Sequence, residues 1–341
     1  MNTPENPICL VTSALRGRLP DNSEWPRLLE VANRAWLGPA LFVAFEREAL
    51  LDHVPGPVRD YLELLHDRNL ERNKRLRDQL IEAVGALNAS GIEPVLLKGA
   101  ITLYSGSETR VRCRMISDLD LNVTPAQESA TKAALLQLRY REMANSREFG
   151  RSEDVGVVEL HFAPNFRAAH YLNGEFGTSA PVLERDLVKA RVPNATAQAA
   201  HLIVHDMIKE GDYRQLRFNL RHLDDIAALA TSGEGIDWHC VAKTLYDRSG
   251  RAALAMQLLA LQELFGVDSP PQLSGGLMNK LRHAARLRAA RESFPGSALR
   301  FVGKLSWGFH LFVQSYERKG GAHFAHRLRS RLLASPKGST L

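Results

Sequence analysis

The sequence is poor in cysteine and contains no long apolar run. Its 341 residues include three cysteines, Cys9, Cys113 and Cys240, which are far apart and odd in number. This number and spacing exclude a disulfide framework and a paired-cysteine metal site. No apolar run approaches the roughly 20 residues of a membrane-spanning helix, and the first residues lack the basic and apolar blocks of a secretory signal. We therefore expect a cytoplasmic protein.

Aromatic residues are also few, at 7% of the chain, but the composition as a whole is that of a globular protein. Hydrophobic residues make up 45% of the chain and charged residues 24%. These proportions exclude collagen-like and disordered classes. At roughly 100–200 residues per domain, the length predicts two or three folding units.

Positive charge is concentrated near the C-terminus. The chain has a net charge of +6, whereas the segment from Lys280 onward contains thirteen Lys or Arg and two Glu. The residues before Lys280 are therefore net negative. A basic segment of this kind suits nucleic acid, an acidic partner or anionic lipid, or forms a solvated helical surface. For an acceptor substrate it favours a polyanion such as tRNA.

The spacing of apolar residues changes twice along the chain. It is helical over 25–52 and over 58–88, where Pro55 and Pro57 mark the start of a long helix. The apolar runs and alternating patterns that follow predict three strands, at 93–97, 118–123 and 155–162, and a helix at 125–138. From Ala195 onward the helical period returns, and helices are expected over 197–209, 214–230, 241–247 and 252–265.

These patterns predict an α+β protein in which a small mixed sheet lies between two helical regions. The expected division is an N-terminal helical region (1–90), an α/β core (91–190), a C-terminal helical region (191–334) and a disordered tail (335–341).

The residues with the clearest chemical pattern are Asp118 and Asp120, in the sequence Ser117-Asp-Leu-Asp-Leu. Side chains alternate along a strand, so both aspartates face one side while the leucines face the core. Two neighbouring carboxylates repel each other unless a cation neutralises them. Mg²⁺ is the natural partner when phosphates supply further oxygen ligands. An exposed strand whose acids face water is the alternative interpretation.

Two further segments favour the metal interpretation. Glu159 and His161 alternate with apolar residues and share one face of another expected strand. If the two strands are neighbours, three carboxylates converge, as in sites where two metal ions assist phosphoryl displacement. Upstream, Lys98 and Gly99 separate a strand from a helix, where glycine permits close approach to phosphate and lysine adds positive charge.

The motifs together resemble the DNA polymerase β-like nucleotidyltransferase superfamily, and most closely its bacterial family of uncharacterised nucleotidyltransferases. The resemblance rests on Leu97-Lys-Gly-Ala, on Arg114-Met-Ile-Ser-Asp-Leu-Asp-Leu, and on Glu159-Leu-His. Arg68-Asn-Leu, His201-x-x-x-His205 and Leu220-Arg-His-Leu-Asp-Asp-Ile are similar to that family as well. The similar region extends from about Leu28 to Gly266.

The resemblance implies a polymerase β-like core and a role for each matching residue. Asp118, Asp120 and Glu159 would be the catalytic residues and the metal ligands, and Glu159 would alternatively accept the proton of the attacking hydroxyl. Arg114 would pair with phosphate or brace the acidic strand. The residues implied in nucleotide binding are Lys98, Gly99, Ala100, Arg114, Ser117 and His161.

Three residues of the C-terminal region are weaker candidates around the site: His205, Arg221 and Asp225. His201 and His205 are four residues apart, a spacing that can bind zinc, but a helix-packing pair is favoured because no third ligand is near in sequence. Asp224 and Asp225 lie on one expected helix with Arg217 and Arg221, and this spacing is typical of surface ion pairs within a helix. The resemblance adds a substrate-contacting role for Asp225.

We therefore predict an enzyme that transfers an NMP group from an NTP, ATP or GTP, to an acceptor hydroxyl and releases pyrophosphate. Mg²⁺ or Mn²⁺ would be the cofactor. The acceptor is open among a small molecule, a peptide or protein, and an RNA. The alternative is a catalytically silent scaffold that binds a nucleotide or a partner.

Overall fold

The chain begins with a helical N-terminal region. The computed structural model describes residues 6–144, 147–162, 170–172, 177, 179–291 and 303–305. Within this region, Asn6 caps the first helix by accepting a hydrogen bond from the backbone of Ile8. The elements are α1 (Pro7–Leu15), η1 (Asn22–Glu24), α2 (Trp25–Arg34), α3 (Gly38–Arg47) and η2 (Leu51–His53).

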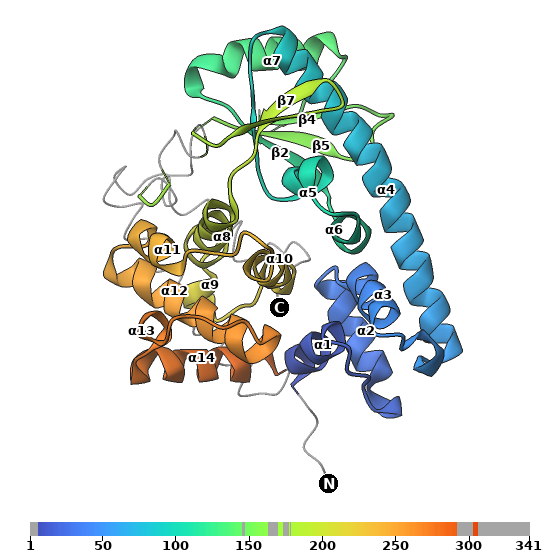
Figure 1. Cartoon of the computed structure of the whole chain (residues 1–341), viewed down its shortest axis with the longest axis vertical. Coiled ribbons are helices and arrows are strands. Elements are labelled where there is room, and N and C mark those ends of the chain that lie inside the picture. Colours follow the sequence, from blue (N-terminus) through green and yellow to red (C-terminus); the bar gives the residue numbers. More distant parts are fainter. Residues whose placement is uncertain are drawn as a thin grey trace.

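One long helix, α4 (Gly56–Ala89), joins this region to the sheet. Its 34 residues follow Pro55, with Pro57 in the first turn, where a missing N–H costs no helical hydrogen bond. Figure 1 shows α4 running from α2 and α3 to the sheet. Leu62 lies in the core of the N-terminal helices, whereas Leu76 and Leu80 pack beneath the sheet. The same helix therefore contributes to two cores.

The described residues form a seven-stranded mixed sheet with the order β3-β4-β5-β2-β1-β7-β6. β2 pairs in parallel with β5 and antiparallel with β1, so it lies at the centre. The strands are β1 (Val95–Leu96), β2 (Asp118–Asn122), β3 (Arg141–Glu142), β4 (Glu148–Gly150), β5 (Val157–His161), β6 (Val182–Arg185) and β7 (Val188–Arg191). Between them lie α5 (Gly99–Ser105), α6 (Glu108–Cys113), η3 (Pro125–Gln127) and α7 (Glu128–Gln137).

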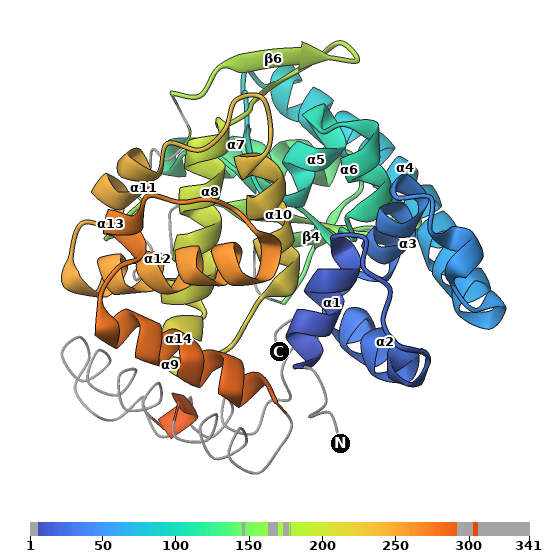
Figure 2. The same cartoon turned by 60° about the horizontal axis from the view of Figure 1, so that its bottom comes forward.

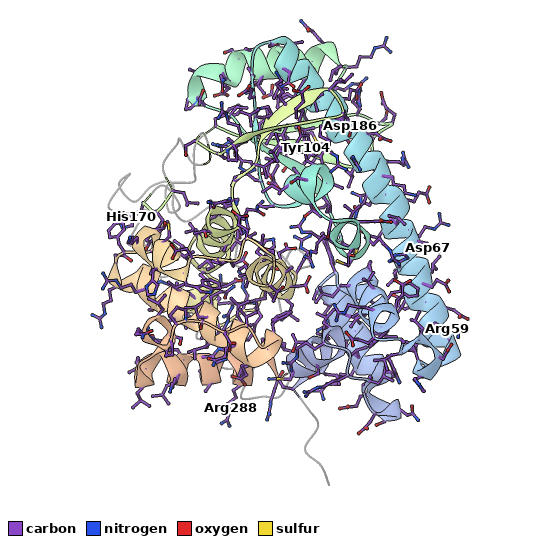
Figure 3. The ribbon with its side chains drawn as sticks, viewed as in Figure 1. Arg59, Asp67, Tyr104, His170, Asp186 and Arg288 are labelled. Carbon is purple, nitrogen blue, oxygen red and sulfur yellow. The ribbon has the colours of Figure 1, made fainter. Side chains whose placement is uncertain are left out.

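The hairpin of β6 and β7 is tied to the core by a buried tyrosine. A two-residue turn, Asp186 and Leu187, connects the strands, and both residues have positive φ. The Tyr104 hydroxyl of α5 contacts the carbonyl oxygens of Leu183 and Val188, each at 2.8 Å. Figure 3 labels Tyr104 and Asp186. The hairpin thereby extends the sheet beyond β1.

The C-terminal region is again helical. In both Figure 1 and Figure 2 its helices α8 and α10 run side by side, and the two are in contact. The elements are α8 (Ala195–Ile203), a π-helical segment η4 (Val204–Lys209), α9 (Asp212–Gln215), α10 (Leu220–Ala230), α11 (Trp238–Thr244), α12 (Arg248–Ala260), a π-helical segment η5 (Leu261–Phe265), α13 (Pro271–Ser274) and α14 (Leu277–Ala290).

Buried apolar side chains gather in two clusters. The larger contains residues of both helical regions, such as Ile8 and Leu41 with Leu223 and Leu261. The smaller holds the sheet, α5, α7 and the second half of α4. Burying one such side chain contributes roughly 1.5–3 kcal/mol. The N- and C-terminal helices thus share one core, while the sheet has its own.

The predicted α+β architecture with flanking helices is confirmed. Among the described residues, no helix is both long and apolar enough to cross a membrane. The prediction of one continuous helix over 214–230 is wrong. The helix ends before Leu216, which adopts φ +55°, and a new helix capped by Asn219 begins at Leu220. The sequence analysis did not predict α6 or the β6–β7 hairpin. The expected tail, 335–341, and most of the basic segment lie outside the described residues.

Candidate active site

The acidic residues of the two motifs lie on neighbouring strands. The parallel register of β2 and β5 pairs Asp120 with Glu159 and Asn122 with His161. Paired residues of adjacent strands point to the same side of a sheet, and side chains alternate along each strand. Asp118, Asp120, Glu159 and His161 therefore share one face. The opposite face is buried and is formed by Leu119, Leu121, Val158 and Leu160.

Asp120 is the buried centre of this face. Its side chain is 1% exposed, and its Oδ1 accepts hydrogen bonds from Lys98 Nζ and His161 Nε2, both at 2.8 Å. Its Oδ2 is buried and has no hydrogen-bond partner in the described part of the chain. Burial raises the pKa of Asp120, but the Lys98 charge and the His161 hydrogen bond outweigh it and hold the pKa well below its ordinary value.

Lys98 occupies a strained position between β1 and α5. Its φ of +47° and ψ of −119° are rarely adopted by a residue with a side chain. Burial lowers the pKa of Lys98, but the charge of Asp120, followed by those of Asp118 and Glu159, raises it above its ordinary value. Lys98 is therefore a fixed positive charge among the carboxylates.

Gly99 leaves room for Arg114. A Cβ at Gly99 would lie 2.5 Å from Arg114 Nη1 and 2.7 Å from Ile116 Cγ2, so any side chain would displace one of them. The next residue, Ala100, has a buried side chain, and its N–H donates to the Leu97 carbonyl. Its expected role in nucleotide binding stays a prediction.

Asp118 lies at the start of β2, beside a serine and an arginine. Its Oδ1 accepts a hydrogen bond from Ser117 Oγ at 3.0 Å. Arg72 of α4 donates to the carbonyl oxygens of Ile116 and Ser117. Burial, followed by the Arg75 charge, lowers the pKa of Arg72, and the Asp118 charge opposes this shift. The sequence analysis did not single out Arg72, because it is one of many charges in the middle of a long helix.

Arg114 is braced by Asp225 from the C-terminal region. The Nε and Nη2 atoms of Arg114 donate to the carboxylate at 2.8 Å each, and both side chains are buried. Arg110 adds bonds to Asp225 at 2.6 Å and to Asp224 at 2.8 Å. Burial raises the pKa of Asp225, but the Arg114 and Arg110 charges hold it well below its ordinary value. Asp225 and Arg114 thus join α10 to the segment that leads into β2, and both roles considered for Arg114 stay predictions.

The expected ion pair within one helix is wrong. Arg221 does not pair with Asp225. Its guanidinium lies 4.8 Å from the ring centre of Trp36 and donates to the Met115 carbonyl. Arg217 pairs with Asp212 instead. Asp225 is buried against α6. Its carboxylate is hydrogen-bonded to Arg110 and Arg114 there, and not to an arginine of its own helix.

Two asparagines of α4 fix the backbone that leads into β2. Asn73 Nδ2 donates to the carbonyl oxygens of Val111 and Arg114, both at 2.8 Å, and Asn69 Nδ2 donates to that of Arg112 at 2.9 Å. Asn69 lies in Arg68-Asn-Leu, one of the segments that resemble the nucleotidyltransferase family. These bonds hold the segment between α6 and β2 against the long helix.

His201 and His205 lie on one face of the helix that faces the site, with ring centres 6.4 Å apart. Burial, followed by the Lys98 charge, lowers the pKa of both imidazoles, and that of His205 falls to about 4. Both rings are therefore neutral at pH 7.

The acidic face has the ligands of a divalent metal site. Within the described residues, Asp120, Glu159 and His161 each offer a ligand atom within 4.8 Å of the others. Asp118 shares their face but is not part of this group. Because carboxylate oxygens suit Mg²⁺ and the unpartnered Oδ2 of Asp120 needs a positive neighbour, the residues fit a divalent cation.

Comparison with known proteins gives one match. A family model described as an uncharacterised nucleotidyltransferase matches residues 21–266, more than two thirds of the chain. Searches of the curated proteins and of the solved structures gave no match.

The packing at Gly99 predicts that a single methyl group is destabilising there. Gly99→Ala forces a methyl against Ile116 and the pinned guanidinium of Arg114, so the free energy of unfolding should fall by about 1–3 kcal/mol. Gly56→Ala is the control, because nothing lies within 4 Å of its Cβ position. Denaturant unfolding measures both, and equal stability of the two variants would contradict the packing.

The Arg114–Asp225 pair predicts a large loss of stability when its charge is removed. Asp225→Asn leaves a buried guanidinium uncompensated and should cost about 3–5 kcal/mol in unfolding free energy. Glu30→Gln, which removes an exposed pair with Arg34, should cost less than about 1 kcal/mol.

The same pair predicts a pH dependence. The folded-state pKa of Asp225 is depressed, so its stabilisation is complete above about pH 4, the ordinary pKa of an unfolded aspartate, and is lost at lower pH. The stability difference between the native protein and Asp225→Asn should therefore be constant from pH 5 to pH 7 and shrink in stronger acid. A difference that grows in acid would refute the pairing.

Proposed function

This chain belongs to the uncharacterised nucleotidyltransferase family, and from that premise we propose that it moves an NMP group from an NTP to an acceptor hydroxyl. The acceptor oxygen bonds to the α-phosphorus, the bond from that phosphorus to the leaving oxygen breaks, and pyrophosphate departs. The observation that carries the proposal is the pairing of Asp120 with Glu159 across β2 and β5, on the face that includes Asp118.

The reaction requires a divalent metal, Mg²⁺ or Mn²⁺. Asp118, Asp120 and Glu159 would hold two such ions, with His161 beside them. When bound, the ions neutralise phosphate charge and favour attack at phosphorus. The buried, unpartnered Oδ2 of Asp120 supports this assignment, because an ionised oxygen without a donor is costly.

The protein's own residues supply charge and position. His161 donates to Asp120 Oδ1 and thereby orients the carboxylate. Lys98 contacts the same oxygen and would place its positive charge beside the triphosphate of a bound NTP. Glu159 is 27% exposed, compared with 1% for Asp120. An acceptor from solvent can therefore reach Glu159, and we assign to it the proton of the attacking hydroxyl.

ATP or GTP is the proposed donor, and the acceptor is defined here only as a hydroxyl. Most of the basic segment that favoured a polyanion such as tRNA lies outside the described residues, so a polyanionic acceptor stays a prediction. Salt would weaken the binding of a polyanion and leave a neutral acceptor unaffected.

The proposal predicts that Asp120→Asn and Asp118→Ala abolish transfer and leave the fold intact. Loss of metal binding should reduce pyrophosphate release at least about a thousandfold, since the chemistry depends on phosphate charge being neutralised. The measurement is incubation with labelled NTP, Mg²⁺ and cell extract, followed by detection of pyrophosphate and of the labelled fraction.

Glu142→Gln is the matched control, because this exposed carboxylate lies on the edge strand β3, away from the acidic face. It should retain full activity. Full activity in Asp120→Asn would refute the metal assignment. Calorimetry that finds no binding of any NTP in the presence of Mg²⁺ would favour the scaffold alternative.

A further inference from the structure

A second group of metal-ligating side chains lies in the C-terminal region, where the π-helical segment η4 meets α10. Asp206 Oδ1 lies 3.0 Å from His205 Nδ1 and 2.8 Å from His222 Nδ1. The three residues each offer a ligand atom within 4.8 Å of the other two. None of the three is assigned as a ligand in the site proposed above.

The group is buried and incompletely satisfied. The side chains of Asp206 and His222 are 1% and 2% exposed. Asn219 Nδ2 adds a third contact to Asp206 Oδ1 at 3.2 Å, so all three neighbours contact the same oxygen. Within the described residues, Asp206 Oδ2 and His222 Nε2 are buried without a hydrogen-bond partner. A buried charge with one oxygen unsatisfied is costly unless a further cation is bound.

The π-helical backbone of η4 brings the side chains of the consecutive residues His205 and Asp206 into contact. On an α-helix, consecutive side chains diverge by about 100°, so neighbours seldom contact the same atom. His205 and Asp206 lie in the π-helical segment Val204–Lys209, and such segments occur frequently at functional sites. Asn219 caps α10 by accepting a hydrogen bond from the His222 backbone N–H, which fixes the position of His222.

We propose that His205, Asp206 and His222 form a binding site for a divalent transition metal of the zinc class. Two imidazoles and a carboxylate are typical zinc ligands and are poor ligands for Mg²⁺. A tetrahedral ion with bonds of 2.0–2.1 Å places its ligands roughly 3.3 Å apart. The observed 2.8 and 3.0 Å separations require an opening of a few tenths of an ångström. Each neutral imidazole would bind the ion through Nδ1 and carry its proton on Nε2.

Such an ion would connect η4 to α10. α10 also carries Asp225, which braces Arg114 beside Gly99. The bound ion would therefore stabilise the C-terminal region that supports the acidic face. The proposal does not depend on nucleotidyl transfer, because the ligands and the predicted metal differ from those of the active site.

The test uses Co²⁺ as a spectroscopic substitute for Zn²⁺ in the full-length, tag-free protein. The variant Asp118→Asn/Asp120→Asn/Glu159→Gln removes the three active-site carboxylates, so one remaining equivalent of Co²⁺ should give the visible absorption of a four-coordinate site. Zn²⁺ should displace it, and millimolar Mg²⁺ should not. Adding His222→Gln should weaken Co²⁺ binding by at least about 10–100-fold.

Two further variants separate loss of a ligand from loss of the fold. Asp206→Asn keeps the side-chain shape and should also weaken binding, while His283→Gln removes a buried histidine paired with Glu263, outside the group, and should bind normally. Circular dichroism checks each variant. The proposal is overturned if the carboxylate-free protein shows no Co²⁺ absorption, or if folded His222→Gln or Asp206→Asn binds as tightly as His283→Gln.

Discussion

The active-site face depends on one constraint, the burial of the Asp120 carboxylate at the centre of the sheet. A buried charge must be compensated, and Lys98 and His161 reach the same oxygen from a strained turn and from the neighbouring strand. The register that sets His161 opposite Asn122 also sets Glu159 beside Asp120. The location of the acids and the histidine thus follows from the pairing of β2 with β5, and that of the lysine from the pairing of β1 with β2.

The helical regions support this face through long-range polar contacts. α4 holds the segment leading into β2 through Asn69 and Asn73, and α10 braces Arg114 through Asp225. Both sets of contacts are largely buried, where hydrogen bonds to backbone and charge are most costly to lose. Elements far apart in sequence therefore determine where β2, which carries Asp118 and Asp120, begins.

Period and alternation were enough to predict the strands and their polar faces, because Asp-Leu-Asp-Leu and Val-Glu-Leu-His repeat every second residue. Pairing between β2 and β5 was a hypothesis, since no local signal selects a partner strand. The partners of Asp225 could not be read from its own helix, because tertiary contact with α6 overrides i,i+4 spacing. The β6–β7 hairpin was missed since its turn uses Asp186 and Leu187 rather than glycine.

The length of α4 has a mechanical consequence. At 1.5 Å per residue, its 34 residues form a continuous rod about 51 Å long. One end packs among the N-terminal helices, and the other lies under the sheet. Between them, Asn73 hydrogen-bonds the Arg114 carbonyl in the segment that leads into β2. The helix has no internal break. A tilt of the N-terminal helices would therefore tilt all of α4 and shift the strand that carries Asp118 and Asp120.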